Sequence, residues 1–258
     1  MGALPSSPLH RTGVLWNPIC FMMKVFLGWF WLAVSLFGTE SYSFVDLGLT
    51  DEEKEAAMQL QFDRVRGFDR YDRFGALGEL QGELIEFFKG LGSHSEDVAK
   101  RAARVIERTV EFVLQTTGKE SAWVCVRVFR ESSFFDQPRW HTDGRYFGFD
   151  DLFKSQTCVK FAAALKGPGT LFYPVSEEEG GVFQAHRNDR GFLARFLDPQ
   201  KAIQARPGEG AFFVVADPLH SAVHSEPPLT EDRLFFSVLP GSNEEIQELF
   251  GRWHPRKN

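Results

Sequence analysis

The feature that most constrains the fold of this chain is a change of hydrophobic period near residue 121. Upstream, apolar residues recur every three or four positions, as they do along one face of a helix. Downstream, they alternate with polar residues or form short runs that Gly and Pro interrupt, a pattern typical of strands. These apolar segments are 123–129, 159–165, 170–175, 211–215, 220–225 and 234–239. Short strands at this spacing predict two packed antiparallel sheets, as in a sandwich or jelly roll.

The upstream half predicts three amphipathic helices. Thr50 and Glu53 are spaced as a capping box, in which each side chain accepts a hydrogen bond from the other residue's backbone. The helix that begins there is expected to end near residue 65. A second helix is expected over about 77–88 and a third over about 96–116. We expect these helices to cover one face of a sheet as a buttress, which makes the fold class α+β.

The first 43 residues have the pattern of a targeting segment. An apolar run over residues 25–38 follows Lys24, and the small residues after it fit a cleavage rule near Ser41 or Ser43. The run is shorter than the roughly 20 residues that a membrane-spanning helix needs. A buried helix is the alternative, which the lack of a polar face disfavours. We therefore expect a signal peptide or, if uncleaved, a membrane anchor, and hence a protein of the secretory pathway or the membrane.

Charge and cysteine spacing exclude several classes of function. The net charge is −6 and no Lys/Arg-rich tract occurs, so we expect no nucleic-acid partner. The chain has 3 cysteines and no CxxC pair, which argues against a zinc ribbon or a thioredoxin-type motif. Cys125 and Cys158 lie in expected strands, where they either pair in an oxidising compartment or act as small buried residues; the second interpretation is favoured.

Candidate metal ligands follow the first expected strand. His141 and Asp143 are two residues apart, so in extended backbone their side chains point to the same side. A neutral nitrogen and an anionic oxygen suit a borderline divalent metal, but two ligands hold it weakly and a third must come from elsewhere. His224 and His220 both lie in a later expected strand. The interval to Arg233, which begins the last strand, favours His224.

The order His-x-Asp, distant His and then Arg resembles the 2-oxoglutarate/Fe(II)-dependent dioxygenase superfamily, and its spacing is most similar to the prolyl-hydroxylase branch. The resemblance implies a double-stranded β-helix, or jelly roll, that binds Fe(II) with His141, Asp143 and His224. It also implies that Arg233 binds the distal carboxylate of 2-oxoglutarate, the cosubstrate. A second cosubstrate-binding residue is expected among Arg127, Tyr146 and Lys160. The implied activity is hydroxylation of a C–H bond in a small molecule or peptide.

The expected organisation therefore has four parts. A signal segment covers 1–43, a helical buttress 44–120, the double-stranded β-helix oxygenase domain 121–245 and a C-terminal tail 246–258. Within the β domain, residues 176–206 contain few strand signals and are expected to form an insertion or lid. Membrane contact is expected only through the first part, if it is not removed.

Two other functions fit the same pattern. One is a catalytically silent jelly-roll domain that binds a ligand and is tethered through residues 25–38. The other is a hydrolase or isomerase that uses a different metal in a related barrel. A stoichiometric Fe(II) site separates the oxygenase from the silent domain, and the coordination geometry of the Co(II)-loaded protein separates it from zinc-type chemistry.

Overall fold

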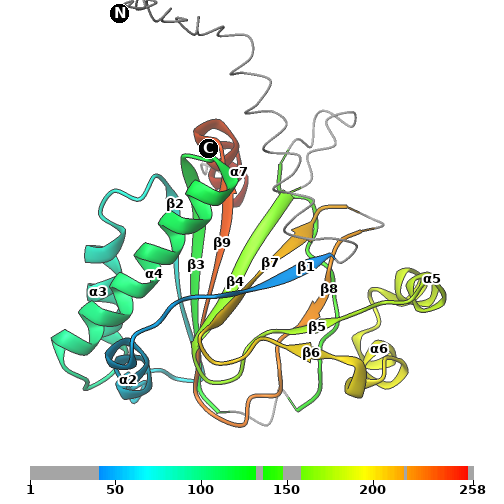
Figure 1. Ribbon diagram of the computed structural model, residues 1–258, viewed down its shortest axis with the longest axis horizontal. Coiled ribbons are helices and arrows are strands. Elements are labelled where there is room, and N and C mark those ends of the chain that lie inside the picture. The colour runs from blue at the N-terminus through cyan, green and yellow to red at the C-terminus, as the bar shows by residue number, and fades with distance from the viewer. Residues whose placement is uncertain (1–40, 132–135, 148–157, 218–219, 255–258) are drawn as a thin grey trace, which may run out of the picture. The chain divides into compact units, whose positions relative to one another are not determined.

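The computed structural model describes residues 41–131, 136–147, 158–217 and 220–254, in which the strands form two antiparallel sheets (Figure 1). The larger sheet contains, in spatial order, β1 (Tyr42–Asp46), β7 (Glu209–Val215), β4 (Cys158–Lys166), β9 (Arg233–Gly241), β3 (Ser121–Phe129) and β2 (Phe68–Gly75). The smaller sheet contains β6 (Ile203–Gln204), β5 (Leu171–Tyr173) and β8 (Val223–Ser225).

From β3 onward, the chain passes repeatedly between the two sheets. β3, β4, β7 and β9 belong to the larger sheet, whereas β5, β6 and β8 belong to the smaller one. Between β3 and β4, His141 forms an isolated antiparallel bridge with His224 of β8 and so extends the smaller sheet by one position. Eight segments arranged in this order form a double-stranded β-helix, so the expected α+β class with a jelly roll is confirmed.

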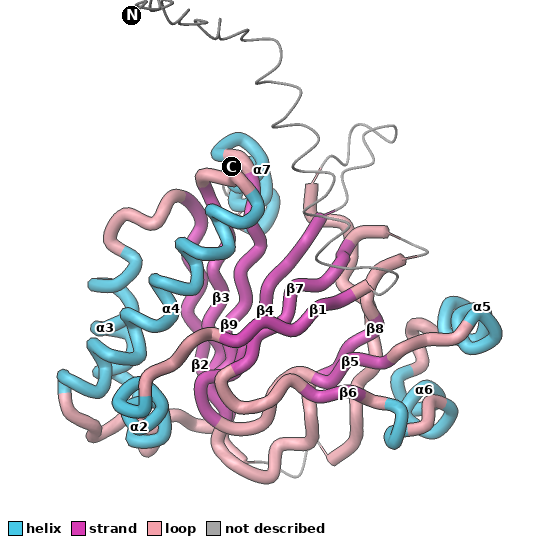
Figure 2. Tube along the Cα trace, viewed as in Figure 1, coloured by secondary structure: helices cyan, strands magenta, loops and turns pink. Residues whose placement is uncertain are grey.

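Three helices buttress the larger sheet on the side away from the smaller one, as expected (Figure 2). They are α2 (Asp51–Gln59), α3 (Leu80–Leu91) and α4 (Glu96–Thr117). The capping box of α2 is present, with Thr50 Oγ1 accepting from the backbone N–H of Glu53 at 3.2 Å. α2 ends earlier than predicted because Leu60 leaves the helical conformation and is fully buried.

Two edge strands lie in the region that was predicted to be only helical. β1 and β2 occupy opposite edges of the larger sheet. β2 carries four charged residues and no buried one, so its hydrophobic pattern is too weak to reveal it. β1 begins at Tyr42, which is buried, so the expected boundary after residue 43 lies inside a strand.

The expected C-terminal tail is also corrected. Residues Asn243–Trp253 form α7, which has a capping box between Ser242 and Glu245 and buries Ile246 and Leu249. These two residues are three positions apart, so the helical pattern covers only about one turn. In the 176–206 segment, two helices and a 3-10 turn precede β6: α5 (Glu177–His186), α6 (Arg190–Phe196) and Pro199–Lys201.

Aromatic side chains fill much of the space between the sheets. Phe172 of β5 stacks on Tyr42 of β1 at 4.8 Å and meets Phe213 of β7 edge-on at 5.6 Å. Such pairs add to the stabilisation that burial provides. No helix in the described part of the chain is long and apolar enough to cross a membrane, and the run 25–38 lies outside that part.

Candidate active site

Backbone pairing brings two of the candidate metal ligands together. The N–H of His141 donates to the carbonyl of His224 at 3.0 Å, and the N–H of His224 donates back at 2.9 Å. This bridge places the two imidazole rings 4.4 Å apart. Trp140 faces the opposite way and is fully buried against Tyr173, with the rings 5.4 Å apart. Trp140 is thus a core residue that anchors the histidine segment.

Each of these histidines is held in one tautomer. Nδ1 of His141 lies 2.8 Å from the carbonyl oxygen of Arg139, and Nδ1 of His224 lies 3.0 Å from that of Ala222. A carbonyl oxygen only accepts hydrogen bonds, so Nδ1 carries the proton and Nε2 of the neutral ring presents a lone pair. Such backbone partners orient imidazoles that bind metals.

Asp143 completes the cluster. Its Oδ1 lies 3.9 Å from Nε2 of His141 and 3.8 Å from Nε2 of His224. One ligand atom from each of the three residues lies within 4.8 Å of the others. The backbone carbonyl of Asp143 accepts from the N–H of Ala216, whose φ of 69° is unusual for a residue other than glycine. Local strain of this kind is found at functional sites.

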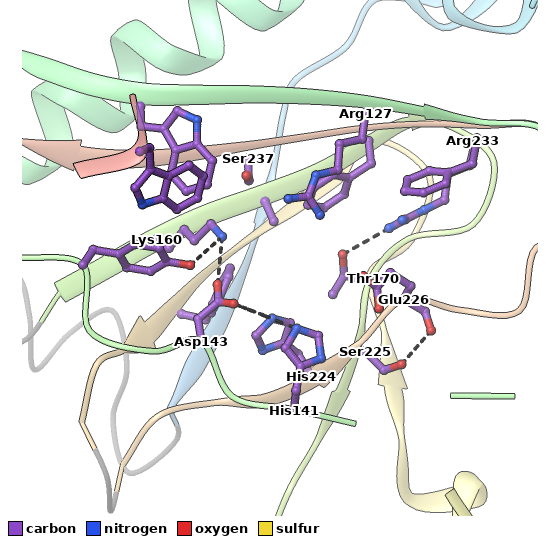
Figure 3. Close-up of a pocket in the computed structure, with 17 residues that line it drawn as sticks. Arg127, His141, Asp143, Lys160, Thr170, His224, Ser225, Glu226, Arg233 and Ser237 are labelled. Atoms are coloured by element: carbon purple, nitrogen blue, oxygen red, sulfur yellow. Dashed lines mark hydrogen bonds and ion pairs between the residues drawn. The ribbon is translucent and has the colours of Figure 1, made fainter. Parts of the chain in front are cut away.

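Lys160 of β4 holds the second oxygen of the same carboxylate. Its Nζ donates to Asp143 Oδ2 at 2.8 Å and to the Tyr146 hydroxyl at 3.4 Å (Figure 3). Burial opposes ionisation of Asp143, but the charges of Lys160 and His224 outweigh it and hold its pKa well below the usual range. Burial lowers the pKa of His224 to about 4, and the neighbouring His141 acts in the same direction. At neutral pH the site therefore offers an anionic oxygen and a neutral His224 ring.

His220, the rival third ligand, lies outside this cluster. Its side chain is exposed and its Nδ1 pairs with Asp217 at 3.0 Å. The geometry thus brings together His141, Asp143 and His224.

Arg233 lies at the start of β9, only 1% exposed. Its Nε donates to the carbonyl of Pro168 at 2.8 Å, and one terminal nitrogen lies 3.4 Å from Thr170 Oγ1. The turn that supplies these partners needs Gly167, whose φ is +75° and where a Cβ would lie 2.6 Å from the carbonyl oxygen of Asp232. Arg233 is therefore a buried cation with neutral partners and not half of a surface ion pair with Glu231 or Asp232.

Both groups open into one cavity of about 170 Å³. It is lined by all three triad residues, Arg233 and the three other candidates named from the sequence: Arg127, Tyr146 and Lys160. Lys160 and Tyr146 lie beside Asp143, whereas Thr170 lies beside Arg233 (Figure 3). Other lining residues were not named from the sequence as site residues, because their local pattern does not indicate ligand binding; among them are Thr170, Glu226, Ser237 and Trp253.

The donor set fits a divalent metal of the iron type. Two neutral imidazole nitrogens and one carboxylate, all directed to one side, form the arrangement found in non-haem Fe(II) oxygenases, in which the remaining metal positions stay open. The chain therefore has both the double-stranded β-helix and the His-x-Asp…His arrangement that are typical of 2-oxoglutarate/Fe(II)-dependent dioxygenases.

Comparisons with known proteins return related folds at low identity. No protein-family model matches the sequence, and no curated protein matches it. A dioxygenase for auxin oxidation from rice has a TM-score of 0.46 at 12% identity, covering 78% of this chain and 73% of its own. A viral collagen prolyl hydroxylase from Paramecium Bursaria Chlorella virus-1 has a TM-score of 0.41 at 16% identity, covering 79% and 90%. A Pseudomonas putida prolyl-4-hydroxylase has a TM-score of 0.38 at 15% identity, covering 82% of this chain and 98% of its own. A likeness this loose assigns neither activity nor substrate.

Proposed function

We propose that this chain is an Fe(II)- and 2-oxoglutarate-dependent dioxygenase that hydroxylates a C–H bond of a small molecule or a peptide side chain. The observation that carries the proposal is one cavity with two complementary groups. At one side it has a metal-binding triad, and at the other a buried Arg233 whose hydrogen-bond partners are neutral and which forms no ion pair among the described residues, although Glu226 acts on its charge.

The roles follow from the positions of the side chains. His141, Asp143 and His224 bind the metal through Nε2, Oδ1 and Nε2. Arg233 and the Thr170 hydroxyl bind the distal carboxylate of 2-oxoglutarate, since a planar guanidinium matches a carboxylate and an adjacent hydroxyl adds a donor. When bound, Fe(II) supplies the reaction of dioxygen with 2-oxoglutarate, which yields succinate and CO₂ while the second oxygen atom enters the substrate C–H bond.

The remaining walls of the cavity keep the reaction centre dry. Trp123, Phe213 and Phe235 line it together with the aromatic ring of Tyr146. An apolar wall limits the access of water, which would otherwise compete with the substrate for the reactive oxygen. Lys160 orients Asp143 by occupying Oδ2, so that Oδ1 is the oxygen that faces both histidines.

The test is formation of succinate from 2-oxoglutarate by the purified protein, measured with and without added Fe(II) after treatment with a chelator. We expect turnover that needs Fe(II). Slow turnover is expected even without a prime substrate, because 2-oxoglutarate can be converted to succinate without hydroxylation of a substrate. His220→Ala is the matched control and should keep this turnover, since His220 is exposed and outside the cluster. Equal succinate formation with and without Fe(II) would refute the proposal.

The Lys160–Asp143 ion pair also supports a second candidate, a silent binding domain. A cation bound to a ligand carboxylate competes with a metal for that group. If Lys160 outcompetes the metal for Asp143, the protein keeps its fold but does not bind iron tightly, and the cavity serves only for ligand binding. A metal titration that finds no stoichiometric Fe(II) site would favour this candidate.

For localisation we propose entry into the secretory pathway through the apolar run 25–38. The support is its sequence pattern. Because β1 starts at Tyr42 and pairs with β7, cleavage must leave Tyr42 in place for the sheet to keep its edge. Cleavage after Ser41 satisfies this condition, whereas cleavage after Ser43 does not. N-terminal sequencing of the secreted protein tests this, and a mature N-terminus beyond residue 42 would contradict it.

A further inference from the structure

A third cation faces the cavity and has no role in the proposed metal or cosubstrate sites. Arg127 lies on β3 opposite Phe235 of β9, two residues along β9 from Arg233. Figure 3 shows its guanidinium extending into the cavity between Lys160 and Arg233. The side chain is half-buried, so its charge is partly removed from water.

Arg127 forms no ion pair with a carboxylate in the described part of the chain, although Glu226 and Asp72 lie near enough to favour its charge. Lys160 pairs with Asp143, but no Asp or Glu of the described residues lies within ion-pair distance of Arg127. Its side chain does contact the thiol of Cys125, whose pKa burial raises to about 11, so this partner is neutral. Asp72 is paired with Arg70, and Glu226 acts on Arg233 as well, so neither carboxylate balances Arg127 alone. A partly buried cation that is incompletely balanced is unfavourable. The arrangement is stabilised if a ligand supplies the anion.

The net charge of the cavity also favours an anionic ligand. Its charged lining residues are two carboxylates and three cations: Asp143, Glu226, Arg127, Lys160 and Arg233. The cavity thus has one excess positive charge. A divalent metal and a dianionic 2-oxoglutarate cancel each other and leave this excess unchanged. One further negative charge, brought by the substrate, would neutralise it.

Arg233 is the better cosubstrate anchor of the two arginines. It is 1% exposed and has the Thr170 hydroxyl beside it, whereas Arg127 is less deeply buried and forms no hydrogen bond with a hydroxyl of the described residues. Arg127 is also on the same strand face as Trp123, another lining residue. An anion on Arg127 would thus place the rest of its molecule near aromatic walls.

We propose that Arg127 binds the carboxylate of the substrate, and that the substrate is a small monocarboxylic acid with an apolar body. The inference rests on the proposed dioxygenase function. A carboxylate fits because a guanidinium binds it through two parallel hydrogen bonds and because the cavity is small, about 170 Å³. The apolar body fits the aromatic lining.

The experiment compares acids with their uncharged amides. Butyrate, hexanoate and 3-phenylpropionate, each beside its carboxamide, are titrated by calorimetry into protein loaded with Mn(II) and 2-oxoglutarate. We expect at least one acid to bind more tightly than its amide by about 10-fold or more, because a charge-assisted hydrogen bond contributes about 1.5–3 kcal/mol. Arg127→Gln should abolish this preference. Arg127→Lys, which keeps the charge but loses the planar fork, should retain part of it.

Two results would overturn the inference. The first is that no acid binds more tightly than its amide. The second is a roughly 10-fold loss of 2-oxoglutarate affinity in Arg127→Gln, which would assign Arg127 to the cosubstrate. A thermal melt of each variant confirms folding. If Mn(II) and 2-oxoglutarate do not bind to the unaltered protein, the proposed dioxygenase fails separately, and the acid–amide comparison on metal-free protein still decides whether Arg127 binds carboxylates.

Discussion

The two sheets contribute opposite kinds of side chain to the cavity. The three-stranded sheet and its bridge carry His141 and His224, whose Nδ1 atoms are both fixed by backbone carbonyls. The six-stranded sheet carries three cations, on β3, β4 and β9: Arg127, Lys160 and Arg233. Asp143 lies in the segment that joins the two sheets and pairs with Lys160. In the proposed function, the short sheet therefore supplies the metal-binding histidines, whereas the long sheet supplies the cations that bind anions.

The two sheets also differ in strand length. A strand of nine residues such as β3 or β9 determines which side chains face inward through simple alternation. A strand of three residues such as β8 has too few positions for that, so extra hydrogen bonds define its geometry. If the two sheets have separate roles, variants on each sheet should affect metal binding and anion binding separately.

Loss of the shared carboxylate should have the largest effect. In Asp143→Ala, Fe(II)-dependent succinate formation should fall more than about 100-fold, because replacing residues that only support metal ligands already costs 10–100-fold. The variant also leaves Lys160 buried without a partner, so Asp143→Ala combined with Lys160→Met is the control for folding. Undiminished turnover in either variant would refute the metal site.

Removing the cation of the same pair should chiefly affect stability. In Lys160→Met the Asp143 carboxylate stays buried without its partner, so the free energy of unfolding of the metal-free protein should fall by roughly 3 kcal/mol. Denaturant unfolding measures this change. Adding Asp143→Asn should restore most of the loss, and a double variant as unstable as the single one would show that the ion pair is not the cause.

At the opposite side of the cavity, Arg233→Gln should weaken 2-oxoglutarate binding by about 10–100-fold through loss of charge-assisted hydrogen bonds. The Fe(II) affinity should change little, since the metal ligands come from elsewhere. Calorimetry with each ligand separates the two effects. Arg127→Gln is the matched control, and a larger loss of 2-oxoglutarate affinity there than in Arg233→Gln would exchange the two assignments.

Thr170→Val keeps the shape of the residue and removes one hydroxyl beside Arg233. A neutral donor contributes about 0.5–1.5 kcal/mol, so the KM for 2-oxoglutarate should rise roughly 2–10-fold while kcat at saturation stays the same. Steady-state succinate formation measures both constants. An unchanged KM would remove Thr170 from the cosubstrate site.

Acid should loosen the periphery of the short sheet. Glu179 of α5 bonds to Lys201 and to Tyr173 of β5, and these partners lower its pKa to about 2. Because the pKa of Glu179 in the folded protein lies below the ordinary glutamate value of 4.5, its contribution to stability is complete above about pH 4.5 and is lost as the pH falls towards 2. Amide exchange of α5 should therefore rise across that window. Glu179→Gln should lessen the pH dependence, and an unchanged profile would contradict this role.

The sequence predicted the central strands better than the edge strands. Strands such as β3 and β9 were found because apolar residues alternate over their length, whereas β2 is an edge strand rich in charge and showed no such signal. The α7 helix was missed because only Ile246 and Leu249 mark its buried face. The local hydrophobic pattern therefore predicts elements that are extensively buried, and it misses elements that expose one face to solvent.

The site shows the same limit. The spacing of His141 and Asp143 predicted that they would act together, but two histidines four residues apart could not be separated by strand geometry alone. Tertiary structure separates them, because the backbone of His224 pairs with that of His141 while His220 turns outward to Asp217. Thr170 and Glu226 also line the cavity, but neither belongs to a sequence motif that predicts ligand binding.

The most direct test of the account is an anaerobic calorimetric titration of the metal-free protein with Fe(II). We predict one equivalent bound per chain, tight binding retained in His220→Ala and tight binding lost in His224→Ala. The absence of a stoichiometric site in the unaltered protein, or equal affinity in His224→Ala, would contradict the metal centre on which the proposed activity depends.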